Sequence, residues 1–262
     1  MPIQNCPMCL DTKNVVSSHL VPGALYKECR LPGGHPIVFN SKLVYESSRQ
    51  MQAPLLCKVC EDVLNQGGEN WMMPLFAKAD GSFCFHDLLT LRPPSYVVND
   101  TRVYLTAQNP KIEPDKIIHF AMGVFWKAAV HQWIPKEKEP LIDLGEFAEP
   151  IRKYLKGEAL FPSEMALTMG VLPIPVKHLA ITAPYRGSNA KIKNFLFYAL
   201  GIEFSLSVGS AITDEERSGT ISANPGRPVI VVDFSPMLRD IAAETMKTAY
   251  RAPNVRKYLK KL

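Results

Sequence analysis

The sequence predicts an α+β protein, with a small zinc-binding module at its N-terminal end and a larger mixed α+β domain after it. The chain has 262 residues, enough for one large domain or for one domain and a small module. Its first part is loop-rich and holds two Cys-x-x-Cys pairs, whereas helix and strand patterns follow in irregular order in the rest. We therefore expect a boundary near residue 75, between a zinc module at 1–75 and an α+β domain at 76–262.

The module at 1–75 has few long apolar runs, so it could bury little core by itself. A structural zinc can contribute on the order of 10–16 kcal/mol to the folding of such a module. Its clearest helix starts near Cys57, and we expect Gly67 and Gly68 to end that helix. Glu61 in the first turn suits the positive end of the helix dipole, which is a purely structural reason for its presence.

The first strand expected beyond the module is 102–107, which alternates and is partly β-branched or aromatic. Asp115 can cap a helix that runs to about Trp133, and a second helix is expected over about 146–156. The stretch SEMALTMG at 163–170 predicts a short helix, with a serine cap at its start and a glycine stop at its end.

The last third of the chain is richer in strand patterns. We expect strands at 176–182 and at 228–234. The stretch 194–209 is long enough for two strands with a turn at Gly201. A final helix is expected over about 236–250, so that helices and strands are mixed without a βαβ repeat.

Two Cys-x-x-Cys turns can each present two thiolates to one zinc ion, which prefers four soft ligands in a tetrahedron. The predicted ligands of a structural zinc are Cys6, Cys9, Cys57 and Cys60. The alternatives are four unrelated thiols or a redox pair, but a redox Cys-x-x-Cys normally occurs once, beside a βαβ pattern. Cys29 and Cys84 are expected to fill small apolar niches.

The net charge of +5 comes from residues 76–262, because residues 1–75 hold six basic and six acidic side chains. Six basic residues between Lys247 and Leu262 would attract phosphate backbones, and they are equally explained as a solvated helix end. The chain starts without a signal-peptide pattern, and its most apolar stretch, 117–133, is short and interrupted for a bilayer span. We expect a cytoplasmic protein with no membrane role.

The sequence SHLVP, with His19, lies between the two cysteine pairs. The order Cys-x-x-Cys, then this histidine, then Cys-x-x-Cys-Glu resembles the HNH endonucleases, also called ββα-metal or His-Me finger nucleases, of the zinc-bearing treble-clef kind. The resemblance covers about residues 6–70, roughly a quarter of the chain. It implies a treble clef that binds its structural zinc through the four paired cysteines.

The resemblance also implies roles for the neighbours of these cysteines. His19 takes the place of the family's general base, which deprotonates a water for attack on the scissile phosphate. Before this histidine the family often has an Asp that binds the catalytic metal, and after the last cysteine it often has Asn or His. Here these positions hold Ser18 and Glu61, so Glu61 would be the carboxylate ligand of a catalytic Mg²⁺ or Mn²⁺.

Three further residues are candidates for the same site. The central Asn of the family is matched best by Asn40, and Asn65 is the other candidate. Glu69 could supply a second carboxylate if the chain folds back after the two glycines. Magnesium is often held by only one or two carboxylates, with waters and substrate phosphate completing its shell.

The implied function is a metal-dependent endonuclease that hydrolyses phosphodiester bonds of nucleic acid, with DNA expected ahead of RNA and both left open. Residues 76–262 would then supply substrate choice or control, with a regulatory protein partner, in a defence or mobile-element system. The alternative is a non-catalytic zinc-finger protein that binds nucleic acid or a protein partner, which needs the zinc but not His19. In that case His19 is a hydrogen-bonded histidine under the zinc loop, or a zinc ligand in place of a cysteine.

The other histidines have structural explanations. His86 stands beside an acid, as a pair or at a helix start. The remaining four are expected in a loop, on the apolar helix or in a strand, and they are His35, His119, His131 and His178.

Overall fold

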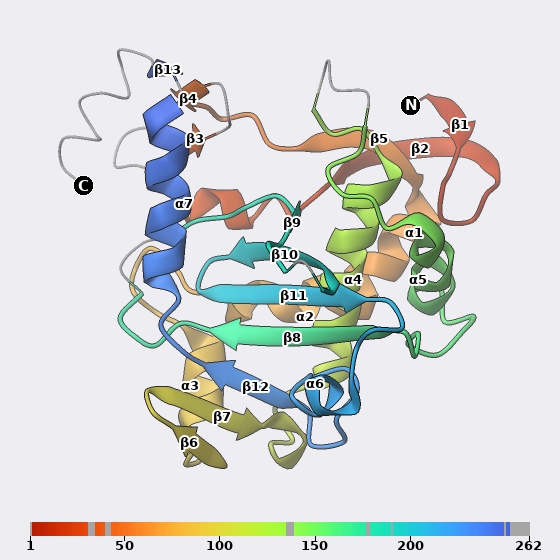
Figure 1. Cartoon of the computed structure of the whole chain (residues 1–262). Helices are drawn as coiled ribbons and strands as arrows, with labels where there is room; N and C mark the ends of the chain where they lie inside the picture. The colour runs from red at the N-terminus through yellow and green to blue at the C-terminus, as the bar shows by residue number, and fades with distance from the viewer. Residues whose placement is uncertain are drawn as a thin grey trace.

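The computed structural model describes residues 2–30, 35–39, 43–134, 139–176, 179–189, 191–248 and 250–251. Helices and strands are mixed along the chain, so the predicted α+β class is confirmed. A seven-stranded sheet has the order β6-β7-β12-β8-β11-β10-β9, and its neighbours are antiparallel except for the parallel pair β12 and β8. Figure 1 shows these strands stacked one below another across the centre of the molecule. In spatial order their bounds are Tyr96–Val98, Thr101–Leu105, Pro228–Val231, Met165–Val171, Ile202–Val208, Lys193–Ala199 and Tyr185–Arg186.

The N-terminal part forms a second sheet of three strands, in the order β1 (Ile3–Asn5), β2 (Thr12–His19) and β5 (Gln52–Cys57). A continuous helical segment follows β5 directly. Its parts are α1 (Lys58–Leu64), the π-helical turn η2 (Asn65–Glu69), α2 (Asn70–Met72) and the 3-10 turn η3 (Met73–Leu75). A third small sheet joins β3 (Ile37–Phe39), β4 (Leu43–Glu46) and β13 (Tyr250–Arg251).

The other helices lie around the large sheet. They are α3 (Cys84–Thr90), α4 (Pro114–Val130), α5 (Ala148–Leu155), α6 (Asp214–Ser218) and α7 (Ser235–Thr248). Three short 3-10 turns are the remaining elements of the described residues, and they are η1 (Leu25–Lys27), η4 (Thr106–Gln108) and η5 (Gly145–Phe147). No helix in these described ranges is long and apolar enough to cross a membrane.

Helix α4 lies behind the sheet in Figure 1 and packs its aromatic side chains against it. The ring of Phe125 meets that of Phe197 on β10 at 5.0 Å, and Phe120 meets Phe204 on β11 at 5.7 Å. A fully buried phenylalanine stabilises a fold by roughly 1.5–3 kcal/mol, so this layer is a major part of the core. One continuous cluster of buried side chains runs from Cys6 through α4 into the sheet. The boundary expected near residue 75 stays a prediction.

Most of the expected elements are present, with shifted ends. The expected strand at 102–107 is β7, the helices at 115–133 and 146–156 are α4 and α5, and the last helix is α7. The stretch 194–209 forms β10 and β11 with the expected turn at Gly201, and β12 covers the first part of 228–234. Residues 179–182 form no strand and make one isolated bridge, between Ile181 and Ala199.

The helix expected at 163–170 is wrong, because this stretch is the central strand β8. It pairs with β11 and β12, one face of it is fully buried, and the other face is buried at Ala166 and half-buried at Thr168 and Gly170. A short apolar run has the same composition in a buried strand as in a buried helix, so its periodicity does not separate the two. The pairing with two neighbouring strands overrides the helix propensity of its Met, Ala and Leu residues.

The expected end of the first helix at Gly67 and Gly68 is also wrong, since the helix continues through them as the π-turn η2. These glycines lie against α4. A Cβ atom on Gly68 would come within 2.4 Å of the Lys116 carbonyl oxygen, and one on Gly67 would come within 2.1 Å of the His119 ring. The two glycines therefore permit a close approach between two helices, a packing role rather than a stop signal.

Candidate metal centre and the polar cluster beside it

Four cysteines from three elements meet at one point. Cys6 and Cys9 lie in the turn between β1 and β2, Cys57 is the last residue of β5, and Cys60 is in the first turn of α1. Their four sulfur atoms all lie within 4.8 Å of one another, and the Cys9 and Cys57 sulfurs are 3.9 Å apart. Zn–S bonds of about 2.3 Å in a tetrahedron place the sulfurs about 3.8 Å apart, so the four thiols have the arrangement that could hold zinc.

The backbone of the first turn is shaped for this cluster. Leu10 has a left-handed φ of 66°, and its N–H donates to the Cys6 carbonyl, while the Cys6 N–H donates to Asp11. The Cys57 N–H donates to the Cys6 sulfur at 3.4 Å. Burial raises the pKa of Cys6, but the backbone N–H groups of Cys57, Cys9 and Met8 outweigh it and lower the pKa to about 7. One thiolate is thus favoured without a metal, as expected of a ligand site.

The raised pKa of the buried Cys60 indicates that a cation would stabilise the four-cysteine cluster. Burial and the neighbouring sulfur atoms raise the pKa of Cys60, because a second negative charge beside the first is unfavourable. A zinc ion would supply the positive charge that lets all four sulfurs ionise. Cys29 and Cys84 lie outside the cluster.

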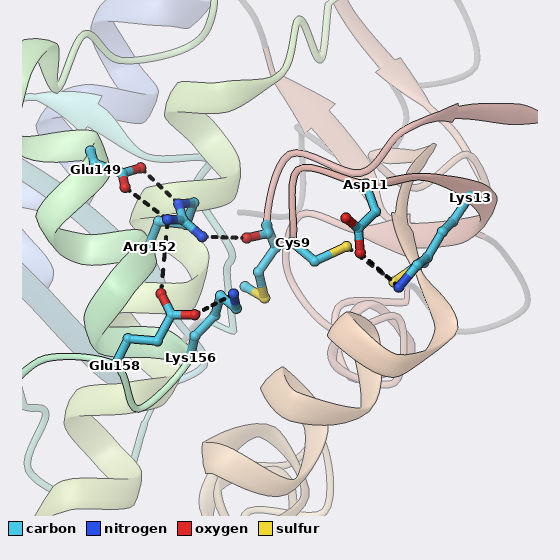
Figure 2. A network of polar contacts seen from close by, with 9 residues as sticks. Cys9, Asp11, Lys13, Glu149, Arg152, Lys156 and Glu158 are labelled. Carbon is cyan, nitrogen blue, oxygen red and sulfur yellow. Dashed lines mark hydrogen bonds and ion pairs between the residues drawn. The ribbon is translucent and has the colours of Figure 1, made fainter.

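An arginine from the larger part of the chain clamps the first cysteine turn (Figure 2). Arg152 on α5 is 8% exposed and donates to the Met8 carbonyl at 2.6 Å. Its other nitrogens are held by Glu149 through two bonds of 2.7 Å, and Glu158 lies 3.9 Å away. Bidentate arginine–carboxylate pairs are geometrically specific, so the turn has a fixed position on α5.

A second group of polar side chains lies beside the cysteines, and we call it the polar cluster: Ser18, His19, Glu61, Glu69 and Lys127. Ser18 is fully buried, and its hydroxyl donates to Glu61 Oε2 at 2.6 Å while accepting from the Leu56 N–H at 3.3 Å. The strand end that carries His19 therefore lies against the helix face that carries Glu61.

Lys127 completes the polar cluster from α4. Its Nζ donates to the His19 carbonyl oxygen at 2.7 Å and to Glu69 Oε1 at 2.9 Å. The Lys127 side chain is 1% exposed and that of Glu69 is 13% exposed, so the pair is nearly desolvated. The π-turn η2 holds more residues per turn than an α-helix does. This wider turn brings Glu69 to the same face of the helical segment as Glu61.

Burial raises the pKa of the Glu61 carboxyl, although the Ser18 hydroxyl and the charge of Lys127 both act to lower it. The charge of Glu69 adds to the increase and that of His19 opposes it, so the four groups interact electrostatically. Unpaired negative charge is therefore unfavourable at Glu61, and a cation near its carboxylate would relieve the cost of burial.

The half-buried His19 ring faces the loop that follows β2. A Cβ atom on Gly23 would come within 3.1 Å of His19 Nε2 and 2.7 Å of Gln50 Oε1, so the ring and the amide border the same small space. Gln50 also lines a surface hollow beyond, together with Tyr26, Arg30, Pro36, Ser47, Ser48 and Arg49. Both arginines are exposed.

Ser18 contacts Glu61 directly, and the charges of His19 and Glu69 act on Glu61, while the His19 ring itself faces Gly23 and Gln50. The catalytic roles expected of His19 and Glu61 stay predictions. Asn40 lies outside the described residues, and so does His178. Asn65 begins the π-turn of the same helix. His86 and His119 lie on α3 and α4 away from the cysteines, and burial lowers the pKa of both.

Two residues of the site have no counterpart among the predicted ones, namely Lys127 and Arg152. Lys127 has one sequence signal, because it is the only Lys, Arg, Asp or Glu from Ile117 to Val130. A charged side chain in such an apolar helix is expected to be buried, and a buried charge needs an ion-pair or hydrogen-bond partner. For Arg152 the sequence offers only the neighbouring Glu149, which does not indicate contact with a cysteine turn.

The chain gives no significant match to protein-family models, to curated proteins or to solved structures.

Proposed function

We propose that the chain is a metal-dependent endonuclease, with His19 as its general base and Glu61 as the ligand of a catalytic Mg²⁺ or Mn²⁺. The observation that supports this best is the 2.6 Å contact between Ser18 and Glu61, because it brings the strand end with His19 against the helix with Glu61. The order of hairpin, cysteines and helix also agrees with the zinc-bearing HNH arrangement that the sequence resembles.

Each residue of the site has a distinct role in the proposed cleavage reaction. A neutral His19 ring accepts a proton from the attacking water. Ser18 fixes one oxygen of Glu61 and leaves the other available for the cation. A bound divalent ion would supply positive charge for the phosphate and the leaving oxygen. The structural zinc would hold β5 and α1 in place without taking part in the reaction.

The hollow next to Gln50 supports nucleic acid as the substrate. Arg30 and Arg49 are exposed on its wall, and arginine binds phosphate through paired N–H groups. Phosphates flanking the scissile one would be held there, with DNA as the expected substrate. We propose a defence or mobile-element system as the biological setting of the enzyme. A protein partner would control its activity there.

A non-catalytic zinc protein is the second candidate. The observation that favours it is that both carboxylates already have protein partners, since Glu61 accepts from Ser18 and Glu69 is paired with Lys127. Such a protein would bind nucleic acid or another protein without cleavage.

A cleavage assay separates the two candidates. Zinc-loaded protein is incubated with plasmid DNA and with RNA, with and without Mg²⁺ or Mn²⁺. We expect cleavage that requires the added ion and that falls by about 100-fold or more in His19→Ala. His131→Ala is the matched control, because this half-buried histidine packs on Trp133 outside the polar cluster.

Glu61→Gln should abolish the response to the added ion, whereas Asp62→Asn, one residue further along the same turn, should keep it. Cleavage that survives His19→Ala would remove His19 as the base. Absence of cleavage with every substrate and ion would contradict the nuclease and leave the binding protein.

A further inference from the structure

Lys127 is a fully buried cation near the end of the apolar helix α4. Burying a charge is costly, and a well-packed apolar side chain is often as stable in such a position as an ion pair. Stability alone therefore does not explain the buried charge of Lys127, and the informative observation is which residues its ammonium group contacts. The ammonium group bonds one residue of the α1–η2 helix and one residue at the end of β2.

Close packing brings the ammonium group to this position. Because Gly67 and Gly68 carry no side chains, η2 lies directly on the backbone of α4 at Lys116 and Phe120. Lys127 lies beyond that contact on the same helix. The indole N–H of Trp133 donates to the Lys127 carbonyl at 2.8 Å, which fixes the last turn of α4.

The hydrogen bond to β2 is made with the main chain of His19 itself, at its carbonyl oxygen. His19 is the last residue of the strand, where the pairing with β5 ends opposite Gln52. A donor at this carbonyl limits the rotation of the peptide that follows His19. The rotamers open to the imidazole depend on the backbone torsions of His19, so a bond that restricts ψ acts on the ring through the backbone.

We propose that Lys127 is a positioning residue for His19, and that α4 is in this way a part of the candidate active site. The proposal rests on the function proposed above and adds a residue to it. Lys127 touches neither substrate nor metal in this account. Its effect is to hold the histidine, with Glu69 as the counter-ion that holds the lysine.

The test combines two changes, Lys127→Met and Glu69→Gln, because removing both charges leaves no unpaired buried ion. The matched control is Lys116→Met. Lys116 lies on the same helix and donates to the Gln66 carbonyl of η2 at 2.7 Å, but it does not contact β2. Zinc content and thermal unfolding verify that each variant is folded.

Two quantities are measured for each folded variant. We expect the single-turnover cleavage rate of the double variant to fall by about tenfold or more with unchanged DNA affinity, since a small displacement of a catalytic group is costly. We also expect the NMR signals of the His19 imidazole to shift in the double variant and not in the control. A rate within twofold of wild type with unchanged imidazole signals would overturn the proposal.

If the double variant does not fold, Lys127→Arg takes its place, because it keeps the charge and moves the donor. A shifted imidazole with a slower reaction supports the proposal, and wild-type values for both refute it. If the wild-type protein cleaves nothing, the nuclease proposal fails, and the imidazole signals alone still decide whether Lys127 positions His19.

Discussion

Glu203 is a carboxyl group inside the large sheet, on β11 between β8 and β10. Burial raises its pKa above the usual range of a glutamate. The folded protein therefore keeps a proton there at pH values where the unfolded chain has already lost it. The free energy of unfolding falls as the pH rises from the usual glutamate pKa, about 4.3, through the raised one.

Replacing this residue by its neutral isostere should stabilise the fold at neutral pH. Glu203→Gln is expected to raise the melting temperature at pH 7, because Gln resembles the protonated carboxyl that the folded protein prefers. The gain should vanish near pH 4, where both states hold the proton. Melting curves at both pH values check this, with the exposed Glu215→Gln as control. If Glu203→Gln and Glu215→Gln changed the melting temperature equally at pH 7, this would contradict burial as the cause of the raised pKa of Glu203.

The residues of the candidate site that could be predicted are those marked by a pattern of neighbouring residues in the sequence. The four cysteines could be found because each pair carries its own spacing. Glu61 directly follows the second pair, whereas His19 lies between the pairs and is indicated by the SHLVP resemblance, and the roles of both stay predictions. Lys127 and Arg152 act over 108 and 144 positions in the chain, on His19 and Met8. Contacts at such separations depend on how whole elements pack, so no local pattern indicates them.

At the scale of elements, the helical segment from α1 to η3 determines the geometry of the site. Its π-turn brings Glu61 and Glu69 to one face, and its glycines bring that face to α4. The sequence predicted the beginning of this helix correctly, and it predicted the wrong end. Glycine usually ends a helix, and only the presence of α4 explains why it does not do so here.

Gly68→Ala tests this packing. The added methyl group would come within 2.4 Å of the Lys116 carbonyl oxygen and 2.6 Å of the Phe120 nitrogen, and these backbone atoms cannot move aside easily. We expect a loss of stability on the order of 1–3 kcal/mol or more in denaturant unfolding. Gly219→Ala is the control, since its methyl group would have no neighbour closer than 3.7 Å. A neutral Gly68→Ala would contradict the close approach.

At the scale of the whole molecule, α4 joins the cysteine-bearing part to the large sheet. One side of α4 meets η2, and its phenylalanines meet β10 and β11. Figure 1 shows α4 behind these two strands. The α+β class could be predicted because it depends only on which kinds of element occur and in what order. The strand order could not, since β12 lies between β7 and β8, which precede it in sequence by more than 50 residues.

We predict that the four cysteines hold a zinc ion and that this ion stabilises one cooperative core, and calorimetry of the whole chain with and without zinc tests this most directly. We predict one bound zinc, a single unfolding transition, and a melting temperature at least about 10 °C lower after chelation. Cys9→Ser should lose this response and Cys84→Ser should keep it. An unchanged melting temperature after zinc removal would contradict the metal centre, and two separate transitions would contradict the single core.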